Sequence, residues 1–372
     1  MKNILTLVVF VLATFSAKAQ ISNITEKFAL PSTLSESSGA IFFNNKLITH
    51  NDSGGENKLY ELDTISGQIT RTVTILNATN TDWEDITQDE TSIYIGDIGN
   101  NSGDRTNLKI YKINKTDYTS QTSVDAETIN FNYLNQTDFT SNLNNTEWDA
   151  EALVSFDDTH LMVFSKNWVN NITKAYLIPK TPGSYPLTAL DASLNSGGLI
   201  TGGTYNPFTG KLYLIGFSNI LLPFIWVCTN FNGSNVFSGT NTKTQLSSLG
   251  FEQAEAITFI NENKYFITSE SFSQNIVSDY AKLMSFSTND IKLTSNGMDA
   301  NEKHILYPNP VINDLTIKSA GVQTVQIYDT KLSQLYKGTQ NVIDMGNFSK
   351  GVYFVRITTD EDNLIIKKVV KN

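Results

Sequence analysis

A short sequence motif recurs five times along this chain. In each copy, small or acidic residues enter an apolar strand, which is followed by a tight turn and a second strand. A unit of roughly 50 residues built from short strands is typical of a β-propeller, in which every repeat forms one blade. The first strands begin near Glu36, Asp82, Asp149, Leu199 and Gln253, and the second strands lie at residues 47–49, 93–95, 162–164, 212–214 and 265–267. We therefore predict an all-β protein with a five-bladed β-propeller over residues 20–290.

Two further features bear on this propeller. A strand near Ile24–Phe28 is expected to close the last blade, and the long connection Thr119–Thr146 leaves six blades as the alternative. The only cysteine is Cys228, so no intramolecular disulfide can form and the body must depend on its apolar core. We expect Cys228 to be a buried strand residue.

The N-terminus has the pattern of a secretory signal peptide. A basic start, Met1–Asn3, precedes the apolar run Ile4–Phe15 and the small residues Ala17 and Ala19. The apolar run is shorter than the about 20 residues that a transmembrane helix needs. We expect residues 1–19 to be removed, so that the mature chain is exported and has no transmembrane segment.

The C-terminal end reads as a second domain. The string Tyr307–Pro310 precedes short alternating strands, and Gly351–Ile357 and Lys367–Lys371 complete the pattern. This combination resembles the C-terminal sorting domain of the type IX secretion system, a small β-sandwich. The resemblance implies a sorting domain at residues 302–372 after a linker at 291–301. It also implies that the type IX secretion machinery is a partner, and that the chain passes through the periplasm to be secreted or held at the outer-membrane surface.

The repeat predicts which side chains meet. In a propeller, residues that enter the first strand of a blade and residues that leave its second strand surround the same channel mouth. Acidic residues prevail at both positions, including Glu36, Asp82 and Asp149, and the whole chain carries a net charge of −10. These carboxylates can simply cap strand ends, or they can hold a cation with a structural, ligand-linking or catalytic role, and for oxygen ligands Ca²⁺ fits better than zinc or copper. The candidate metal ligands are Asp52, Glu84, Asp97, Glu151, Glu255 and Glu270.

Two polar loops that follow second strands are candidate ligand contacts. The loops at residues 50–55 and 96–105 combine amides and carboxylates with glycines, which permit positive φ. Such loops can wrap a ligand, or they can be rigid turns in which Asn and Asp bond to their own backbone. The candidate ligand-binding residues are His50, Asn51, Asn100, Asn101 and Arg105, together with Lys166 from the third repeat.

These strings resemble a family of exported bacterial β-propellers without an assigned activity. The resemblance covers roughly residues 30–290 and is carried by His50–Gly54, Asp82–Ile86, Gly96–Asn101 with Arg105, Asp149–Leu153, Glu255–Ile257 and Thr268–Glu270. Ser165-Lys166 stands where the family usually has Thr-Lys, and Gly216–Ser218 replaces a usual Arg-Thr-Tyr, which removes a cation. A more distant similarity to β-propeller phytases and phytase-associated esterase-like domains implies Ca²⁺ in the acidic mouth.

The negative charge of the body is the main feature that excludes classes of function. An acidic body argues against nucleic-acid binding, and the three histidines offer no zinc spacing. We predict a secreted or cell-surface binding module whose acidic mouth suits calcium and a small polar or glycan ligand. A calcium-dependent hydrolase of phosphate or carboxylic esters is the alternative, and an adhesin that uses the propeller's sides is a third. Whether the protein is an enzyme stays open at this point.

Overall fold

The computed structural model describes residues 21–274, 276–293, 304–319, 321–331, 333–359 and 364–372. The chain divides into two compact units, Met1–Lys292 and Leu293–Asn372. The signal peptide expected at residues 1–19 lies outside the described residues, as does most of the linker expected at 291–301. No helix in the described parts of the chain is both long enough and apolar enough to span a membrane.

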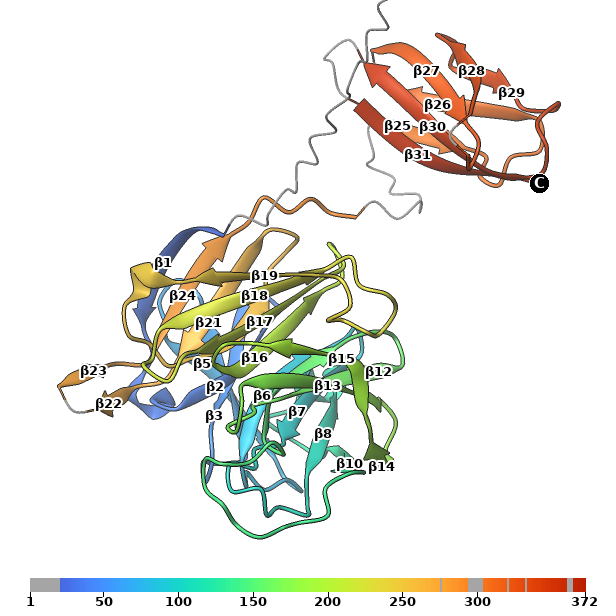
Figure 1. The fold of residues 1–372 in the computed structure, drawn as a ribbon. Coiled ribbons are helices and arrows are strands. Elements are labelled where there is room, and N and C mark those ends of the chain that lie inside the picture. The colour runs from blue at the N-terminus through green and yellow to red at the C-terminus, as the bar shows by residue number, and fades with distance from the viewer. Residues whose placement is uncertain (1–20, 275, 294–303, 320, 332, 360–363) are drawn as a thin grey trace, which may run out of the picture. The chain divides into compact units, whose positions relative to one another are not determined.

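The first unit is built from five sheets of four or five strands (Figure 1). The first sheet contains β2 (Ser37–Phe43), β3 (Lys46–Asn51), β4 (Lys58–Asp63), β5 (Ile69–Ile75) and β9 (Ser123–Val124). The second contains β6 (Trp83–Gln88), β7 (Ser92–Asp97), β8 (Lys109–Asn114), β10 (Glu127–Tyr133) and β14 (Gly183–Leu187). The third contains β11 (Ala150–Ser155), β12 (His160–Ser165), β13 (Ile172–Pro179) and β15 (Ala189–Asn195).

The last two sheets complete this unit. The fourth contains β16 (Leu199–Asn206), β17 (Lys211–Phe217), β18 (Pro223–Thr229) and β19 (Thr240–Gln245). The fifth contains β20 (Ala254–Phe259), β21 (Lys264–Ser269), β24 (Lys282–Ser287) and β1 (Ser22–Ala29). The strand predicted near Ile24–Phe28 is therefore present as β1, and it pairs antiparallel with β24. Strands from both ends of the unit thus meet in one sheet.

The first strands of the sheets, which we call the inner strands, contact one another in order. β2 contacts β6, β6 contacts β11, β11 contacts β16, β16 contacts β20, and β20 contacts β2. The fold is β-propeller-like. Buried side chains fill the spaces between neighbouring sheets: Ile48 packs with Trp83, and Phe164 packs with Phe224 and Cys228. Cys228 lies buried in β18, as predicted, and burial raises the pKa of its thiol to about 12.

The long connection Thr119–Thr146 forms no sheet of its own. Its strand β9 pairs in parallel with β5, and its strand β10 pairs antiparallel with β8. The connection begins in the short helix α1 (Lys115–Ser120). These strands therefore widen the first two sheets at their outer edges. A hairpin of β22 (Phe272–Gln274) and β23 (Val277–Asp279) extends from the fifth sheet.

The second unit contains two antiparallel sheets. One has β25 (His304–Tyr307), β26 (Asp314–Ser319) and β29 (Val342–Asp344). The other has β28 (Gln334–Gly338), β27 (Val322–Tyr328), β30 (Gly351–Thr359) and β31 (Leu364–Lys371). Leu315, Val325 and Val355 belong to one apolar core that both sheets share. This is the arrangement of a small β-sandwich.

Candidate cation site where the inner strands begin

Each inner strand has a register irregularity near its start. The shift lies between Trp83 and Ile86 in β6, and between Ala150 and Ala152 in β11. Equivalent shifts occur in β2, β16 and β20. A β-bulge bends its strand and redirects a side chain, so these shifts place one residue of every repeat in the same environment. The five equivalent residues are Ser38, Glu84, Glu151, Thr201 and Glu255.

The two hydroxyl residues of this set link neighbouring inner strands. Ser38 Oγ donates to the carbonyl of Glu84 at 2.5 Å, and Thr201 Oγ1 donates to the carbonyl of Ala254 at 2.7 Å. The three glutamates are 6–7% exposed. We use the term acidic end for this part of the molecule, which contains Asp52, Asp82, Glu84, Asp149, Glu151, Glu255 and Glu270. The hydroxyls therefore stabilise the frame, whereas the carboxylates are available for other bonds.

Lys166 neutralises one part of the acidic end. It is 8% exposed and forms an ion pair with Glu151. Burial alone would lower the pKa of Lys166, but attraction by Glu151 and Glu255 outweighs it, so that pKa is raised. Its Nζ also lies 4.9 Å from the ring centre of Trp168, whose Nε1 donates to Asp149 Oδ2 at 2.7 Å. Lys166 is therefore a fixed internal charge.

Asp52, Asp82 and Glu84 form a second group, which we call the carboxylate triad. One carboxylate oxygen from each lies within 4.8 Å of the others. Among the described residues, no Lys or Arg forms an ion pair with any of the three. Burial, with repulsion from neighbouring carboxylates, raises the pKa of Asp52 to about 6 and that of Asp82 to about 7, and raises the pKa of Glu84 well above its ordinary value. Burial and repulsion of this kind favour protonation of the carboxylates or a bridging cation.

Gly99 packs directly against the carboxylate triad. A Cβ at this position would lie 2.0 Å from Glu84 Oε1 and 2.4 Å from Asp82 Oδ2. The Gly99 N–H also donates to the carbonyl of Asp82 at 3.2 Å. The loop after β7 can therefore approach the carboxylates closely because this residue has no side chain. Sequence reasoning included Asp82 in the ring but not among the metal ligands, and it missed Gly99 within its glycine-rich loop.

Asp97 and Glu270, two predicted metal ligands, are not members of the triad. Arg105 Nη2 donates to Asp97 Oδ1 at 2.7 Å, and the same oxygen accepts the backbone N–H of Asp82 at 3.2 Å. Arg105 Nη1 also donates to the carbonyl of Gly99 at 2.5 Å, so this cation closes its own loop. Glu270 Oε1 accepts from Gln253 Nε2 at 2.6 Å. Burial, with repulsion from other carboxylates, raises the pKa of Glu270 to about 9.

Glu255, a predicted metal ligand, and His50, a predicted ligand-binding residue, are both buried, and burial shifts the pKa of each. Burial raises the pKa of Glu255 to about 7 even though Lys166 opposes this effect. His50 is fully buried with its ring edge-on to Trp83, and burial lowers its pKa to about 4. Its Nδ1 lies 3.0 Å from the carbonyl of Asn51. The structure therefore places His50 inside the fold beneath the loop.

The three predicted ligand-binding asparagines, Asn51, Asn100 and Asn101, differ in their hydrogen bonds and in their exposure to solvent. Asn51 Nδ2 donates to the carbonyl of Thr33 at 2.8 Å. Asn100 joins its loop to the third sheet, because its backbone N–H donates to Asp149 Oδ1 at 2.6 Å and its Nδ2 donates to the carbonyl of Trp148 at 3.0 Å. Asn101 is exposed. Of the three, Asn101 is the one whose side chain is open to solvent.

Comparisons with known proteins give the following results. The chain is similar to a PQQ-bound aldose sugar dehydrogenase from Streptomyces coelicolor at 9% identity, over 73% of this chain and 99% of that chain, with a TM-score of 0.43. It is similar to an exo-β-1,3-galactanase from Phanerochaete chrysosporium at 7% identity, over 94% and 90%, with a TM-score of 0.46. No curated protein matches. The likenesses to exported bacterial propellers and to phytases stay predictions.

The second unit has a family match. Residues 305–372 match the secretion system C-terminal sorting domain. The domain indicates export by type IX secretion, interaction with that machinery, and a secreted or cell-surface location. The predicted nature of the tail is therefore confirmed: this chain carries a type IX secretion sorting domain behind a β-propeller-like body.

Proposed function

We propose that the body is a five-bladed β-propeller that acts as an exported binding module and holds a divalent cation at its acidic end. The mature module spans residues 20–290, after a signal peptide at 1–19. A linker at 291–301 connects it to the sorting domain at 302–372. The cyclic order of contacts between the inner strands supports five blades.

The carboxylate triad carries the proposal for a cation. Glu151 has Lys166 as its partner and Asp97 has Arg105, but no ion pair neutralises the triad among the described residues. Its oxygens are close enough together to share one ion. A cation would compete with the protons that the raised pKa values favour. The triad is therefore a part of the acidic end where three close carboxylates have no directly bonded cation among the described residues.

Ca²⁺ is the cation that fits best. The triad offers carboxylate oxygens only, and Ca²⁺ takes six to eight oxygen ligands in flexible geometry. Three carboxylates do not fill that shell, so water or a polar ligand can occupy the remaining positions. This is how a binding module with a cation at its surface can capture a small polar molecule. The exported location brings the module into contact with the millimolar calcium for which extracellular sites are built.

Metal analysis and thermal melts of the full mature chain test this proposal. We expect one bound Ca²⁺ per chain after dialysis against calcium, and a melting temperature that rises by about 5 °C between chelator and saturating Ca²⁺. Asp82→Asn and Glu84→Gln should each reduce that rise, whereas the exposed control Asp125→Asn should keep it. Absence of metal, or an unchanged rise in the Asp82→Asn/Glu84→Gln double variant, would refute the proposal.

A further inference from the structure

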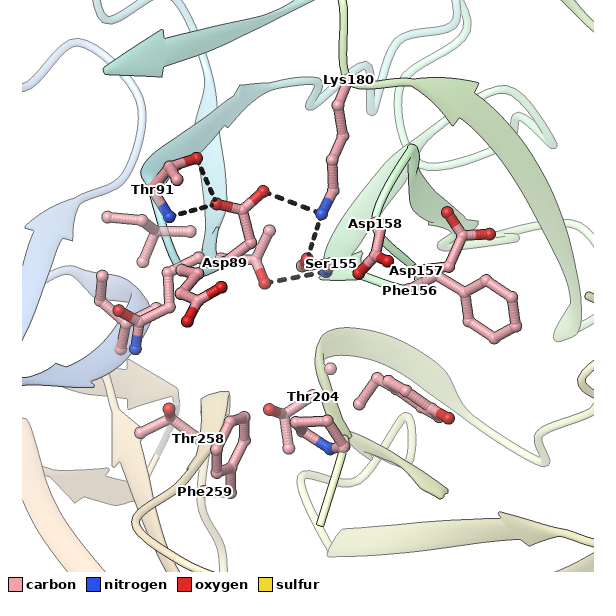
Figure 2. Close-up of a pocket in the computed structure, with 18 of the residues that line it drawn as sticks. Asp89, Thr91, Ser155, Phe156, Asp157, Asp158, Lys180, Thr204, Thr258 and Phe259 are labelled. Atoms are coloured by element: carbon pink, nitrogen blue, oxygen red, sulfur yellow. Dashed lines mark hydrogen bonds and ion pairs between the residues drawn. The ribbon is translucent and has the colours of Figure 1, made fainter. Parts of the chain in front are cut away.

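A cavity of about 360 Å³ lies where the inner strands end, away from the carboxylate triad at their beginnings (Figure 2). All five inner strands contribute to its lining, through Ile41 in β2, Thr87 in β6, Ser155 in β11, Thr204 in β16 and Thr258 in β20. Its size is within the range of small-molecule sites, which are about 300–1,000 Å³. The cavity is therefore a separate candidate binding site.

Polar groups without partners line this cavity. The hydroxyls of Thr204 and Thr258 form no hydrogen bond with any described residue, although these residues are only 7% and 3% exposed. Gln88 Nε2 donates to the carbonyl of Phe42 at 2.8 Å, whereas its buried Oε1 has no partner. A buried polar atom without a partner is costly, which applies to Gln88 Oε1, and the two hydroxyls lie around the same space. They are suited to a ligand that both donates and accepts hydrogen bonds.

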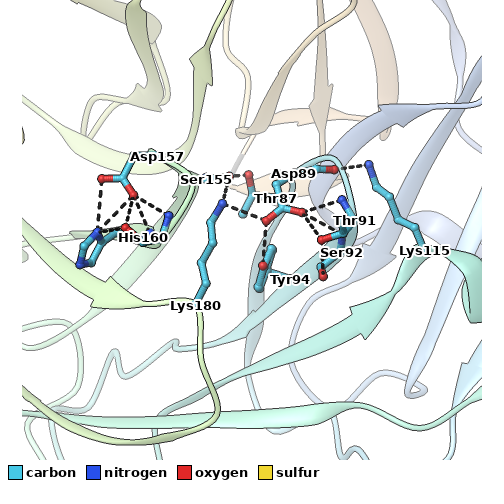
Figure 3. A network of polar contacts seen from close by, with 11 residues as sticks. Thr87, Asp89, Thr91, Ser92, Tyr94, Lys115, Ser155, Asp157, His160 and Lys180 are labelled. Carbon is cyan, nitrogen blue, oxygen red and sulfur yellow. Dashed lines mark hydrogen bonds and ion pairs between the residues drawn. The ribbon is translucent and has the colours of Figure 1, made fainter.

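The cavity has no free cation among its described lining residues. Lys180 Nζ lies 2.9 Å from Asp89 Oδ2 and 2.8 Å from Ser155 Oγ (Figure 3). Asp89 accepts further bonds from the Thr91 N–H at 2.9 Å and from the Tyr94 hydroxyl at 2.8 Å. The Lys180 charge is thus neutralised within the wall. Since Asp158 also lines the cavity, phosphate or carboxylate ligands are disfavoured.

Asp157, a second of the four carboxylates that line the cavity, has partners of its own. Asp157 accepts the backbone N–H groups of Thr159 and His160 at 2.7 Å each (Figure 3). Asp89 and Asp157 therefore already have partners, whereas Glu90 and Asp158, which also line the cavity, have no hydrogen-bond or ion-pair partner among the described residues. Neutral hydroxyl groups would instead meet the unpartnered hydroxyls of Thr204 and Thr258. The hydroxyls thus favour a neutral hydroxylated ligand, and a cation attracted by Glu90 and Asp158 is the alternative that the test must exclude.

Aromatic side chains supply the apolar part of the wall. Phe156, Tyr205 and Phe259 line the cavity, and the rings of Phe156 and Tyr205 lie 5.3 Å apart between centroids. An aromatic wall beside unpartnered hydroxyls matches a ring that has an apolar C–H face and a hydroxylated edge. We propose that this cavity binds a neutral saccharide unit, with Thr204, Thr258 and Gln88 bonding to its hydroxyls and Phe156 or Phe259 packing against its C–H face.

Ligand-observed NMR and calorimetry of the mature full-length chain test this inference. The probes are maltose, cellobiose and lactose at millimolar concentrations, with choline as the cationic comparison. All measurements are made in chelator, so that the outcome does not depend on the cation proposed at the acidic end. We expect at least one disaccharide to bind and choline not to bind.

Variants connect the binding to the cavity. Thr204→Val and Thr258→Val should each raise the dissociation constant about fivefold to tenfold, because each removes one hydrogen bond. Thr258→Ser should retain binding because it keeps the hydroxyl. Thr240→Val is the matched control, since Thr240 is exposed on β19 at the outer edge of the same sheet as Thr204. Circular dichroism melts show whether each variant folds. If a threonine variant does not fold, Phe156→Leu tests the cavity in its place.

Two results support the inference and three overturn it. Saccharide binding that weakens in the valine variants but survives in Thr258→Ser and Thr240→Val supports the site. Loss of binding in Phe156→Leu does so too. The inference is overturned if no disaccharide binds, if binding persists in the Thr204→Val/Thr258→Val double variant, or if choline alone binds.

Discussion

The carboxylate of Asp85 accepts a hydrogen bond from the backbone N–H of Gly203, 118 residues further along the chain, at 3.2 Å. The same Oδ2 accepts the N–H of Leu153 at 2.9 Å, and Oδ1 accepts the N–H of Ile86 at 2.8 Å. Asp85 is 1% exposed, and burial raises its pKa well above its ordinary value. One side chain on β6 thus holds three inner strands together, between the acidic end and the cavity.

Asp85→Ala should destabilise the body strongly. The substitution leaves the N–H groups of Leu153 and Gly203 without a partner inside the fold, and a buried unpaired group costs about 1–3 kcal/mol. We expect a loss of about 3 kcal/mol in the free energy of unfolding, measured by urea denaturation. Asp85→Asn keeps an acceptor and should lose less. A loss no larger than that of the exposed control Asp125→Ala would contradict this role.

Gly99→Ala should impair cation binding more than folding. The added Cβ would lie 2.0 Å from Glu84 Oε1, so the flexible carboxylates of Glu84 and Asp82 must move apart. We expect calorimetry to show at least about a tenfold weaker Ca²⁺ affinity, equivalent to about 1.4 kcal/mol, with a metal-free melting temperature close to that of the wild type. Thr106→Ala, an exposed change in the same loop, should preserve the affinity. Equal Ca²⁺ affinity in Gly99→Ala and Thr106→Ala would show that Gly99 does not contribute to the cation site.

Lys166 and Glu151 should show strong coupling in a double-mutant cycle. Removing one partner of a buried ion pair leaves an uncompensated charge, which typically costs about 3–5 kcal/mol. Lys166→Met alone should therefore destabilise the chain by about 3 kcal/mol, and adding Glu151→Gln should restore part of that loss because the unpaired charge is gone. Urea unfolding of the four proteins measures the coupling. Additive losses would show that the pair contributes nothing specific.

The repeat made much of the fold predictable. The predicted second strands lie within β3, β7, β12, β17 and β21, and the strand near Ile24–Phe28 is β1. The outer strands β9 and β14 were not predictable in the same way. They pair in parallel with β5 and β10, which are distant in the chain, and β9 has only two residues. Such pairings depend on the assembled sheets and leave no periodic signal.

The sequence predicted which acidic residues lie at the candidate site, but not which of them form ion pairs with Lys or Arg. Equivalent positions in the repeats identified Glu84, Glu151 and Glu255 as neighbours. Which carboxylate has a cation as its partner depends on loop geometry, since Arg105 turns back to Asp97 across its own loop. The role of Asp85 follows from a bulge at the start of β6, which the sequence does not reveal. The role of a single residue such as Asp85, which no repeat pattern marks, becomes evident only in the three-dimensional structure.

The stabilising effect of Ca²⁺ should increase as pH rises. The pKa values of Asp52 and Asp82 rise from 3.8 when unfolded to about 6 and about 7 when folded, so above pH 4 the folded state binds more protons than the unfolded state. The stability that these protons supply is fully present below about pH 4 and is lost as pH rises through about 6 to 7. In chelator, the melting temperature should therefore fall over this window, and Asp82→Asn should flatten the fall. Since Ca²⁺ competes with the same protons, its stabilising effect should be larger at pH 8 than at pH 5. Scanning calorimetry at both pH values, with and without Ca²⁺, measures this difference, and an equal calcium effect at the two pH values would show that the ion does not bind to these carboxylates.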